Sequence, residues 1–226
     1  MKFRNLFAGL ALAALALAAS SANATTAWAN WTSGTTGSSS GTASGTLGSG
    51  TVSYTGENEC LNCDASNWSP ASTWTGGSVT SAPPGNSGIQ LWGGNGSVTD
   101  TITFSSPVKD PVIAIVSLGQ GGINASFDFI GNPTFTLEGG GPSTSWGGSG
   151  LTSIGSNVYG SEGNGLVQFL GTYSSISWTN PTYEYYYAFT VGTAGVPEPA
   201  SWSLVIMGLG GVGAALRLRR RKALAA

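Results

Sequence analysis

Apolar and polar residues alternate in short segments along much of the chain after residue 97. In SVTDTITF, the apolar residues Val98, Ile102 and Phe104 fall close to one face, as in a half-buried strand. The run PVIAIVSLG is short and apolar, which is typical of a buried strand. The alternation returns in NASFDFI, PTFTLE, LVQFLG, SISW and EYYYAFTV, where one predicted face carries Tyr185, Tyr187, Phe189 and Val191.

Turn-forming residues separate these segments, for example at Ser106-Pro107, at Gly131-Asn132-Pro133 and at Asn180-Pro181. The same region offers no convincing helical period with caps. Many short strands at intervals of about ten residues are typical of β-sandwiches and related folds. We therefore predict an all-β fold, an antiparallel β-sandwich or jelly-roll-like body over residues 25–195, with most aromatic residues in its core.

Residues 28–50 consist mainly of glycine, serine and threonine, a composition that is typical of flexible linkers. Trp28 and Trp31 precede most of the tract, and Thr51-Val52-Ser53-Tyr54-Thr55 after it alternates as a strand does. We expect a first pair of strands with a mobile loop, so that the tract is partly mobile.

The first 24 residues have the pattern of a secretory signal peptide. Lys2 and Arg4 precede an apolar run, and Ala22 and Ala24 flank Asn23 as in an A-x-A cleavage site. The alternative is a membrane-anchored start, but the run is shorter than the ~20 residues that a bilayer requires. We expect signal peptidase to cleave the chain so that the mature protein begins at Thr25.

A second apolar segment, about residues 200–216, lies near the other end of the chain. As a helix it would span roughly 25 Å, which is enough for a thin inner membrane. A basic cluster then stops the span, and it consists of Arg217, Arg219, Arg220, Arg221 and Lys222. Because basic flanks stay on the cytoplasmic side, we predict a single transmembrane helix with a cytoplasmic tail and an exported body. Trp202 would lie at the opposite interface.

The order of Pro197-Glu198-Pro199, Trp202, the apolar span and the basic end resembles the PEP-CTERM sorting signal of Gram-negative bacteria, over about residues 196–222. The resemblance implies that an exosortase, a membrane-embedded transpeptidase, recognises the Pro-Glu-Pro motif. It further implies that the enzyme removes the span and passes the protein to the cell surface, in hosts that make exopolysaccharide and biofilm. Contact with the inner membrane would then be transient. An ordinary single-span anchor is the alternative.

Charge is distributed unevenly along the chain, although the formal net charge is only −2. Between residues 25 and 197 there are nine acidic residues and one basic residue, Lys109, which gives 1 − 9 = −8. Such a body should repel nucleic acid. The chain contains no histidine, which excludes Ser-His-Asp and Cys-His catalysis and every histidine-ligated metal site. We predict no cofactor.

Cys60 and Cys63 are the two cysteines of the chain. In an exported protein they favour a structural disulfide, which would close off the long loop between Tyr54 and Ile89. Zinc would require further cysteine or histidine ligands, and a redox motif would require a βαβ setting that the pattern does not show.

The residue types allow three further kinds of site: a calcium site, a catalytic carboxylate pair and a carbohydrate-binding surface. Glu57, Glu59 and Asp64, or Glu162, could bind Ca²⁺, but a solvated acidic face is the preferred interpretation, and we predict no metal site. Glu162 and Glu184 would be the carboxylate pair of a glycoside hydrolase.

Tryptophans in predicted loops favour a carbohydrate-binding module more than they favour an enzyme, since aromatic rings stack on sugars; Trp74 and Trp92 are the principal candidates, beside Trp68 and Trp146. The interpretation we prefer is a non-enzymatic cell-surface or matrix protein linked to exopolysaccharide, with a lectin-like module and then a glycosidase as the alternatives.

Overall fold

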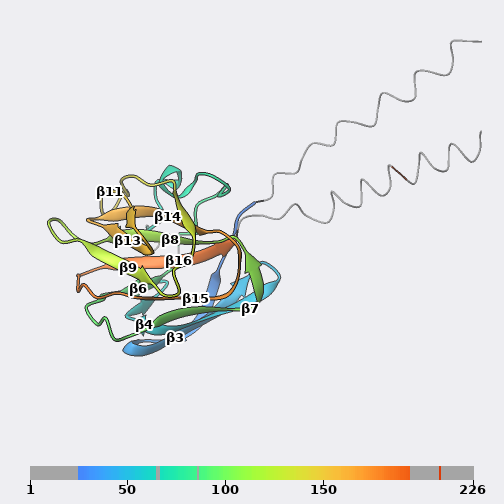
Figure 1. Cartoon of the computed structure of the whole chain (residues 1–226), viewed down its shortest axis with the longest axis horizontal. Helices are drawn as coiled ribbons and strands as arrows, with labels where there is room; N and C mark the ends of the chain where they lie inside the picture. The colour runs from blue at the N-terminus through green and yellow to red at the C-terminus, as the bar shows by residue number, and fades with distance from the viewer. Residues whose placement is uncertain (1–24, 65–66, 86, 194–208, 210–226) are drawn as a thin grey trace, which may run out of the picture. The chain divides into compact units, whose positions relative to one another are not determined.

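The computed structural model describes residues 25–64, 67–85, 87–193 and 209. Thr25–Gly195 forms one compact unit, which we call the body (Figure 1). Between residues 25 and 193 its described part contains strands and one short 3₁₀ helix, η1 (Ala71–Trp74), but no α-helix. No helix in the described part of the chain is long and apolar enough to cross a membrane. The predicted signal peptide (1–24) and the sorting region (196–222), with its span at about 200–216, lie outside the described residues, Leu209 apart.

One sheet, here sheet B, has eight strands in the order β12-β13-β9-β15-β7-β4-β3-β2, and every neighbouring pair is antiparallel. Its strands are β12 (Thr152–Ile154), β13 (Asn157–Gly160), β9 (Ala125–Phe129), β15 (Thr172–Thr179), β7 (Asp100–Lys109), β4 (Gly50–Asn58), β3 (Gly37–Leu47) and β2 (Asn30–Thr35).

The second sheet, sheet A, has the order β10-β14-β8-β16-β6-β5, with β1 paired to β16 and a parallel β11 paired to β14. Its strands are β10 (Phe135–Glu138), β14 (Gly163–Phe169), β8 (Pro111–Leu118), β16 (Tyr187–Thr193), β6 (Ile89–Leu91), β5 (Cys60–Leu61), β1 (Ala27–Trp28) and β11 (Ser149–Gly150). Figure 1 shows β3, β4 and β7 together on one side of the body and β8, β14 and β16 on another.

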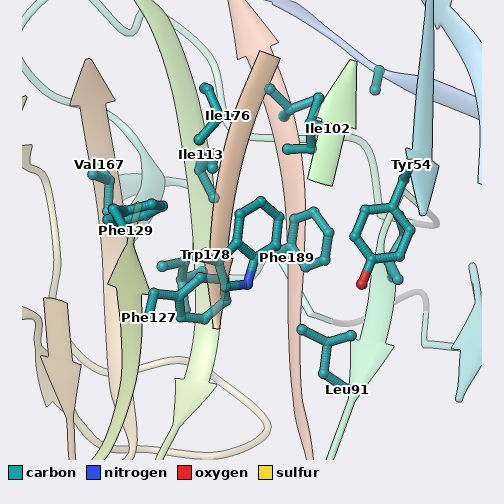
Figure 2. Close-up of a cluster of buried hydrophobic side chains, with 14 of the residues drawn as sticks. Tyr54, Leu91, Ile102, Ile113, Phe127, Phe129, Val167, Ile176, Trp178 and Phe189 are labelled. Carbon is teal, nitrogen blue, oxygen red and sulfur yellow. The ribbon is translucent and has the colours of Figure 1, made fainter. Parts of the chain in front are cut away.

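An aromatic core joins the two sheets. Trp178 of β15 meets Phe189 of β16 edge to face, with ring centroids 5.0 Å apart, and Phe127 of β9 lies 5.3 Å from Trp178. Phe189 lies between Trp178 and Tyr54 in Figure 2, and its centroid is 5.3 Å from that of Tyr54. Aromatic pairs in such geometries contribute beyond the area that they bury. The predicted all-β, antiparallel class is confirmed, whereas the jelly-roll order stays a prediction.

The strand β8 is buried along its whole length, as its apolar sequence predicted. Ile113 and Ile115 point into the core between the sheets, while Val112 and Val116 belong to a second apolar cluster on the outer face of sheet A. Because side chains alternate across a strand, both faces of β8 need an apolar cover.

The segment that contains η1 supplies this outer cover. Trp74 is fully buried in the second cluster, its indole Nε1–H donates to the Ile115 carbonyl at 3.1 Å, and its ring meets Trp68 edge to face at 5.4 Å. The Trp68 Nε1–H donates to the Ser87 carbonyl. Both indoles are therefore structural, and the prediction of Trp74 as a sugar-stacking ring does not hold, because its ring has no accessible face.

Residues 28–50 are strands for most of their length, and only Thr36 separates β2 from β3. The expected strand pair is present, but the expected mobile loop is not. Glycine serves close packing here: a Cβ at Gly45 would lie 2.3 Å from the Asn30 carbonyl oxygen of the neighbouring strand. Composition alone cannot distinguish this use of glycine from its use in a flexible linker.

Trp74→Ala should lower the free energy of unfolding by about 3–5 kcal/mol, because it leaves a cavity over β8 and removes the hydrogen bond to the Ile115 carbonyl. Tyr185→Ala is the matched aromatic control: Tyr185 is 77% exposed, so its loss should change stability by no more than about 0.5 kcal/mol. Urea denaturation followed by tryptophan fluorescence measures both. Equal effects for the two variants would contradict the buried placement of Trp74.

Candidate functional site

The outer face of sheet B is a regular array of hydroxyl groups, which we call the hydroxyl face. Strand register aligns two rows across β2, β3, β4, β7 and β15; they are Ser33–Ser44–Ser53–Thr103–Ser175 and Thr35–Thr42–Thr55–Thr101–Ser177. Neighbouring hydroxyls bond within a row, as between Thr101 and Ser177 at 3.0 Å. Strands lie about 4.8 Å apart, so the hydroxyls repeat at about that interval along each row. A hollow of about 380 Å³ lies over part of this uncharged face, between Thr32 and Thr103.

A buried carboxylate, Asp100, lies at the beginning of β7. The Tyr54 hydroxyl lies within hydrogen-bond distance of the Asp100 carboxylate and of the Glu57 carbonyl, and it can donate to either one. The Glu57 N–H donates to Asp100 at 2.8 Å. Burial raises the pKa of Asp100 to about 6 despite these bonds. Burial likewise raises the pKa of Tyr54 well above its usual value. This group therefore serves to connect β4 to β7.

The Glu57 carboxylate holds the loop that follows β6. Its two oxygens accept the backbone N–H groups of Trp92 at 2.9 Å and Gly93 at 2.8 Å. The residue is buried, and this desolvation raises its pKa although the two N–H donors lower it. Glu57 was a candidate calcium ligand, but both of its oxygens are occupied by the backbone.

The carboxylates of Glu162 and Glu184 bond to the same short segment at the end of β8. Glu162 accepts the Ser117 hydroxyl at 2.8 Å, and Glu184 accepts the Gly119 N–H at 2.7 Å. Burial is the main reason why the pKa of Glu184 rises to about 8, and the Glu162 charge adds to it. The structure thus brings together the pair that the sequence suggested. Glu184 is 1% exposed, however, so it cannot touch a glycan as a catalytic acid must.

Asn164, which no sequence motif marked, fixes a neighbouring loop. Its side-chain amide donates to the carbonyls of Gly141 and Gly147, and its oxygen accepts the Ser117 N–H at 2.9 Å. Asn164 is fully buried, and β14 bulges at this position. A buried amide with its groups satisfied stabilises irregular backbone, so we assign this residue a structural role.

The exposed aromatic side chains of the described residues are Trp92, Tyr183 and Tyr185, at 40%, 60% and 77%. The first follows β6 and the other two precede β16. Alternation had placed Tyr185 on the same inward face as Tyr187, but the strand begins only at Tyr187, and the chain before it follows a different course. The candidate Trp92 is therefore accessible, and two accessible tyrosines lie near it in the fold.

Cys60 and Cys63 form the predicted disulfide, with Cα atoms 5.8 Å apart. It lies at the edge strand β5, which pairs with β6. The described residues contain no group of three or more histidine, cysteine or acidic residues that could hold a metal ion. The sorting residues Pro197, Glu198, Pro199 and Trp202, and the basic cluster from Arg217 to Lys222, lie outside the described residues.

The buried carboxyls make the stability of the body depend on pH. A carboxyl whose pKa is raised on folding binds its proton more tightly in the folded state, so its contribution is complete below the unfolded pKa and is lost as the pH rises through the folded pKa. For Glu184 this window runs from 4.5 to about 8, and for Asp100 from 3.8 to about 6. We predict that the free energy of unfolding falls between pH 5 and pH 8.

Glu184→Gln should remove much of this fall, because the amide is neutral at both pH values. The variant is expected to be more stable than the wild type at pH 8 while losing this advantage at pH 5. Urea denaturation at the two pH values measures the difference. A wild type that gains stability over this range, or a Gln variant with the same slope, would contradict the buried state of the carboxyl.

Comparison with protein-family models matches residues 195–221 to the PEP-CTERM protein-sorting motif. Curated proteins and solved structures, compared in the same way, give no match. The match confirms the resemblance that Pro197-Glu198-Pro199 and the segments after it suggested. The chain therefore carries a PEP-CTERM sorting motif, which marks it as an exported protein that an exosortase sorts toward the cell surface or the medium.

Proposed function

We propose that the protein is a non-enzymatic module of the bacterial cell surface or extracellular matrix, associated with exopolysaccharide. The observation that carries this proposal is the position of the sorting motif relative to the fold. The motif begins at residue 195, directly after β16 ends at Thr193. Cleavage within the motif would leave every described strand of the body in place.

The completeness of the body at Thr193 has a physical basis. β16 lies inside sheet A, where β8 and β6 flank it, and it contributes Phe189 and Val191 to the core. A processing enzyme that cut before Tyr187 would remove an interior strand and unfold the body. A cut at Pro197 to Pro199 would release a folded module instead, as a sorting pathway requires.

The carboxylates of the body support a non-enzymatic role. Asp100, Glu57 and Glu184 are buried, and each accepts a backbone N–H group. Their perturbed pKa values follow from burial within the fold, and structural networks perturb pKa values as active sites do. With no histidine in the chain, acid–base catalysis would depend on such carboxylates.

The surface chemistry of the body is compatible with contact to an extracellular polymer. The hydroxyl face is uncharged and free of aliphatic side chains along its two rows, so it can exchange hydrogen bonds with water or with a hydroxyl-rich polymer. Lys109 is the single basic residue between residues 25 and 193, which disfavours polyanions, nucleic acid included.

Replacing Pro197, Glu198 and Pro199 together by alanine should block sorting. The expected result is that the protein collects in the inner-membrane fraction and is lost from the cell surface and the medium, because the enzyme no longer finds the Pro-Glu-Pro motif. Cell fractionation followed by immunoblotting measures the distribution. Ser203→Ala, within the same matched segment, is the control and should leave sorting unchanged. Normal sorting of the triple variant would contradict the proposal.

A further inference from the structure

The accessible aromatic rings of the described body gather in two loops. Trp92 lies in the loop after β6, and Tyr183 and Tyr185 lie in the segment between β15 and β16. The remaining tryptophans of the described residues are buried or half-buried, and the phenylalanines are too. Exposed aromatic residues that concentrate at one place on a soluble body mark a binding surface.

Backbone hydrogen bonds hold the two loops against each other. The Glu184 N–H donates to the Trp92 carbonyl at 2.8 Å, and the Gly94 N–H donates to the Asn180 carbonyl at 2.9 Å. The Glu57 carboxylate also holds the loop after β6, because it accepts the backbone N–H groups of Trp92 and Gly93. The rings thus stand on a scaffold that is ordered before any ligand arrives, which reduces the entropy lost on binding.

Gly94 allows the close approach of the two loops. Its φ is +84°, and a Cβ at this position would lie 2.6 Å from the Cβ of Tyr183. Any larger residue would push the Tyr183 segment away and would also strain the backbone. Gly94 therefore determines the relative placement of the aromatic rings without contacting a ligand through a side chain.

We propose that Trp92, Tyr183 and Tyr185 form a stacking surface for a neutral polysaccharide. Indole and phenol rings present an apolar face to the C–H groups of a sugar ring and a polar edge to its hydroxyls. The rings also lose little conformational freedom on contact, since each has two side-chain torsions. Residues 92–98 and 180–186 contain no lysine or arginine and a single acidic residue, the buried Glu184, so the surface offers no cation to an anionic polymer.

The choice of a neutral glycan as the ligand rests on this ring chemistry. It also rests on the proposed function, which places the body at the cell surface or in the matrix. Sorting toward the cell surface places the body among extracellular polymers, and the lack of basic residues selects against anionic ones. A second copy of the body is a poor occupant, because a stable protein interface needs a larger apolar area than three separate rings provide. A neutral glycan chain requires only such rings.

Affinity electrophoresis of the full-length protein in detergent micelles tests the site. The probes are the host's own exopolysaccharide, hydroxyethyl cellulose, glycol chitin, laminarin, xylan and galactomannan, with alginate as the anionic control. We expect retardation by at least one neutral polymer and none by alginate. Trp92→Ala and Tyr185→Ala should each weaken binding by about tenfold or more, which is the loss expected for a central aromatic contact.

Matched variants separate ring stacking from other effects. Tyr185→Phe keeps the ring and should bind within about threefold of the wild type. Gly94→Ala should weaken binding although every ring is retained. Ile154→Ala, at a residue that is 75% exposed on β12, should leave binding unchanged.

Retardation by none of the neutral polymers would overturn the proposal. Equal binding by the wild type and the two alanine variants, or an equal loss of binding in Ile154→Ala, would overturn it too. The outcome is separate from that of the sorting test, because electrophoresis does not depend on cleavage of the tail. A correctly sorted protein that binds no neutral glycan would refute the stacking surface and leave the proposed sorting intact.

Discussion

The strand β8 carries apolar side chains on both of its faces, so the outer face of sheet A must be covered as well as the inner one. Much of the fold depends on this requirement. Ile113 and Ile115 face the aromatic core between the sheets, so Val112 and Val116 need a second apolar layer. The segment around η1 supplies it with Trp68 and Trp74. Large rings that the loop composition would leave accessible are thereby used for packing. Among the described residues, accessible rings remain only just after β6 and just before β16.

Buried carboxylates organise the region where those accessible rings lie. Glu57 bonds the backbone at Trp92 and Gly93, and Glu184 bonds Gly119 while its own N–H meets the Trp92 carbonyl. A carboxylate removed from water is costly, so such groups persist where they satisfy backbone donors that would otherwise be unpaired. The same burial underlies the predicted pH dependence of stability and accompanies the ordered loops. Glu57 and Glu184 are in this way part of the scaffold that holds these loops.

Sequence alone predicted the features that depend on local pattern. Alternation located β7, β9, β15 and most of β16, the apolar run located β8, and the Pro-Glu-Pro motif with its basic end located the sorting signal. The pairing of Cys60 with Cys63 also followed, since the chain has no other cysteine.

Features that depend on tertiary contacts were not predictable in the same way. Trp74 is buried because a distant strand needs a cover, and Tyr185 is exposed because β16 begins two residues later. The Gly/Ser/Thr tract folds into β2 and β3 because glycine permits close strand packing beside a core that includes Ala29 and Trp31. The hydroxyl face exists only once strand register is known, since serine and threonine carry the same pattern in a linker.

The central claim is that a folded β body is exported and then separated from a C-terminal sorting signal. The most direct test is the intact mass of the mature protein recovered from the envelope and the medium of its native host. The account predicts a chain that begins at Thr25 and ends within Pro197 to Pro199, with or without an added group at the new C-terminus. A mass that includes every residue through Ala226 would contradict it, because the protein would then be a membrane-anchored domain rather than a sorted one.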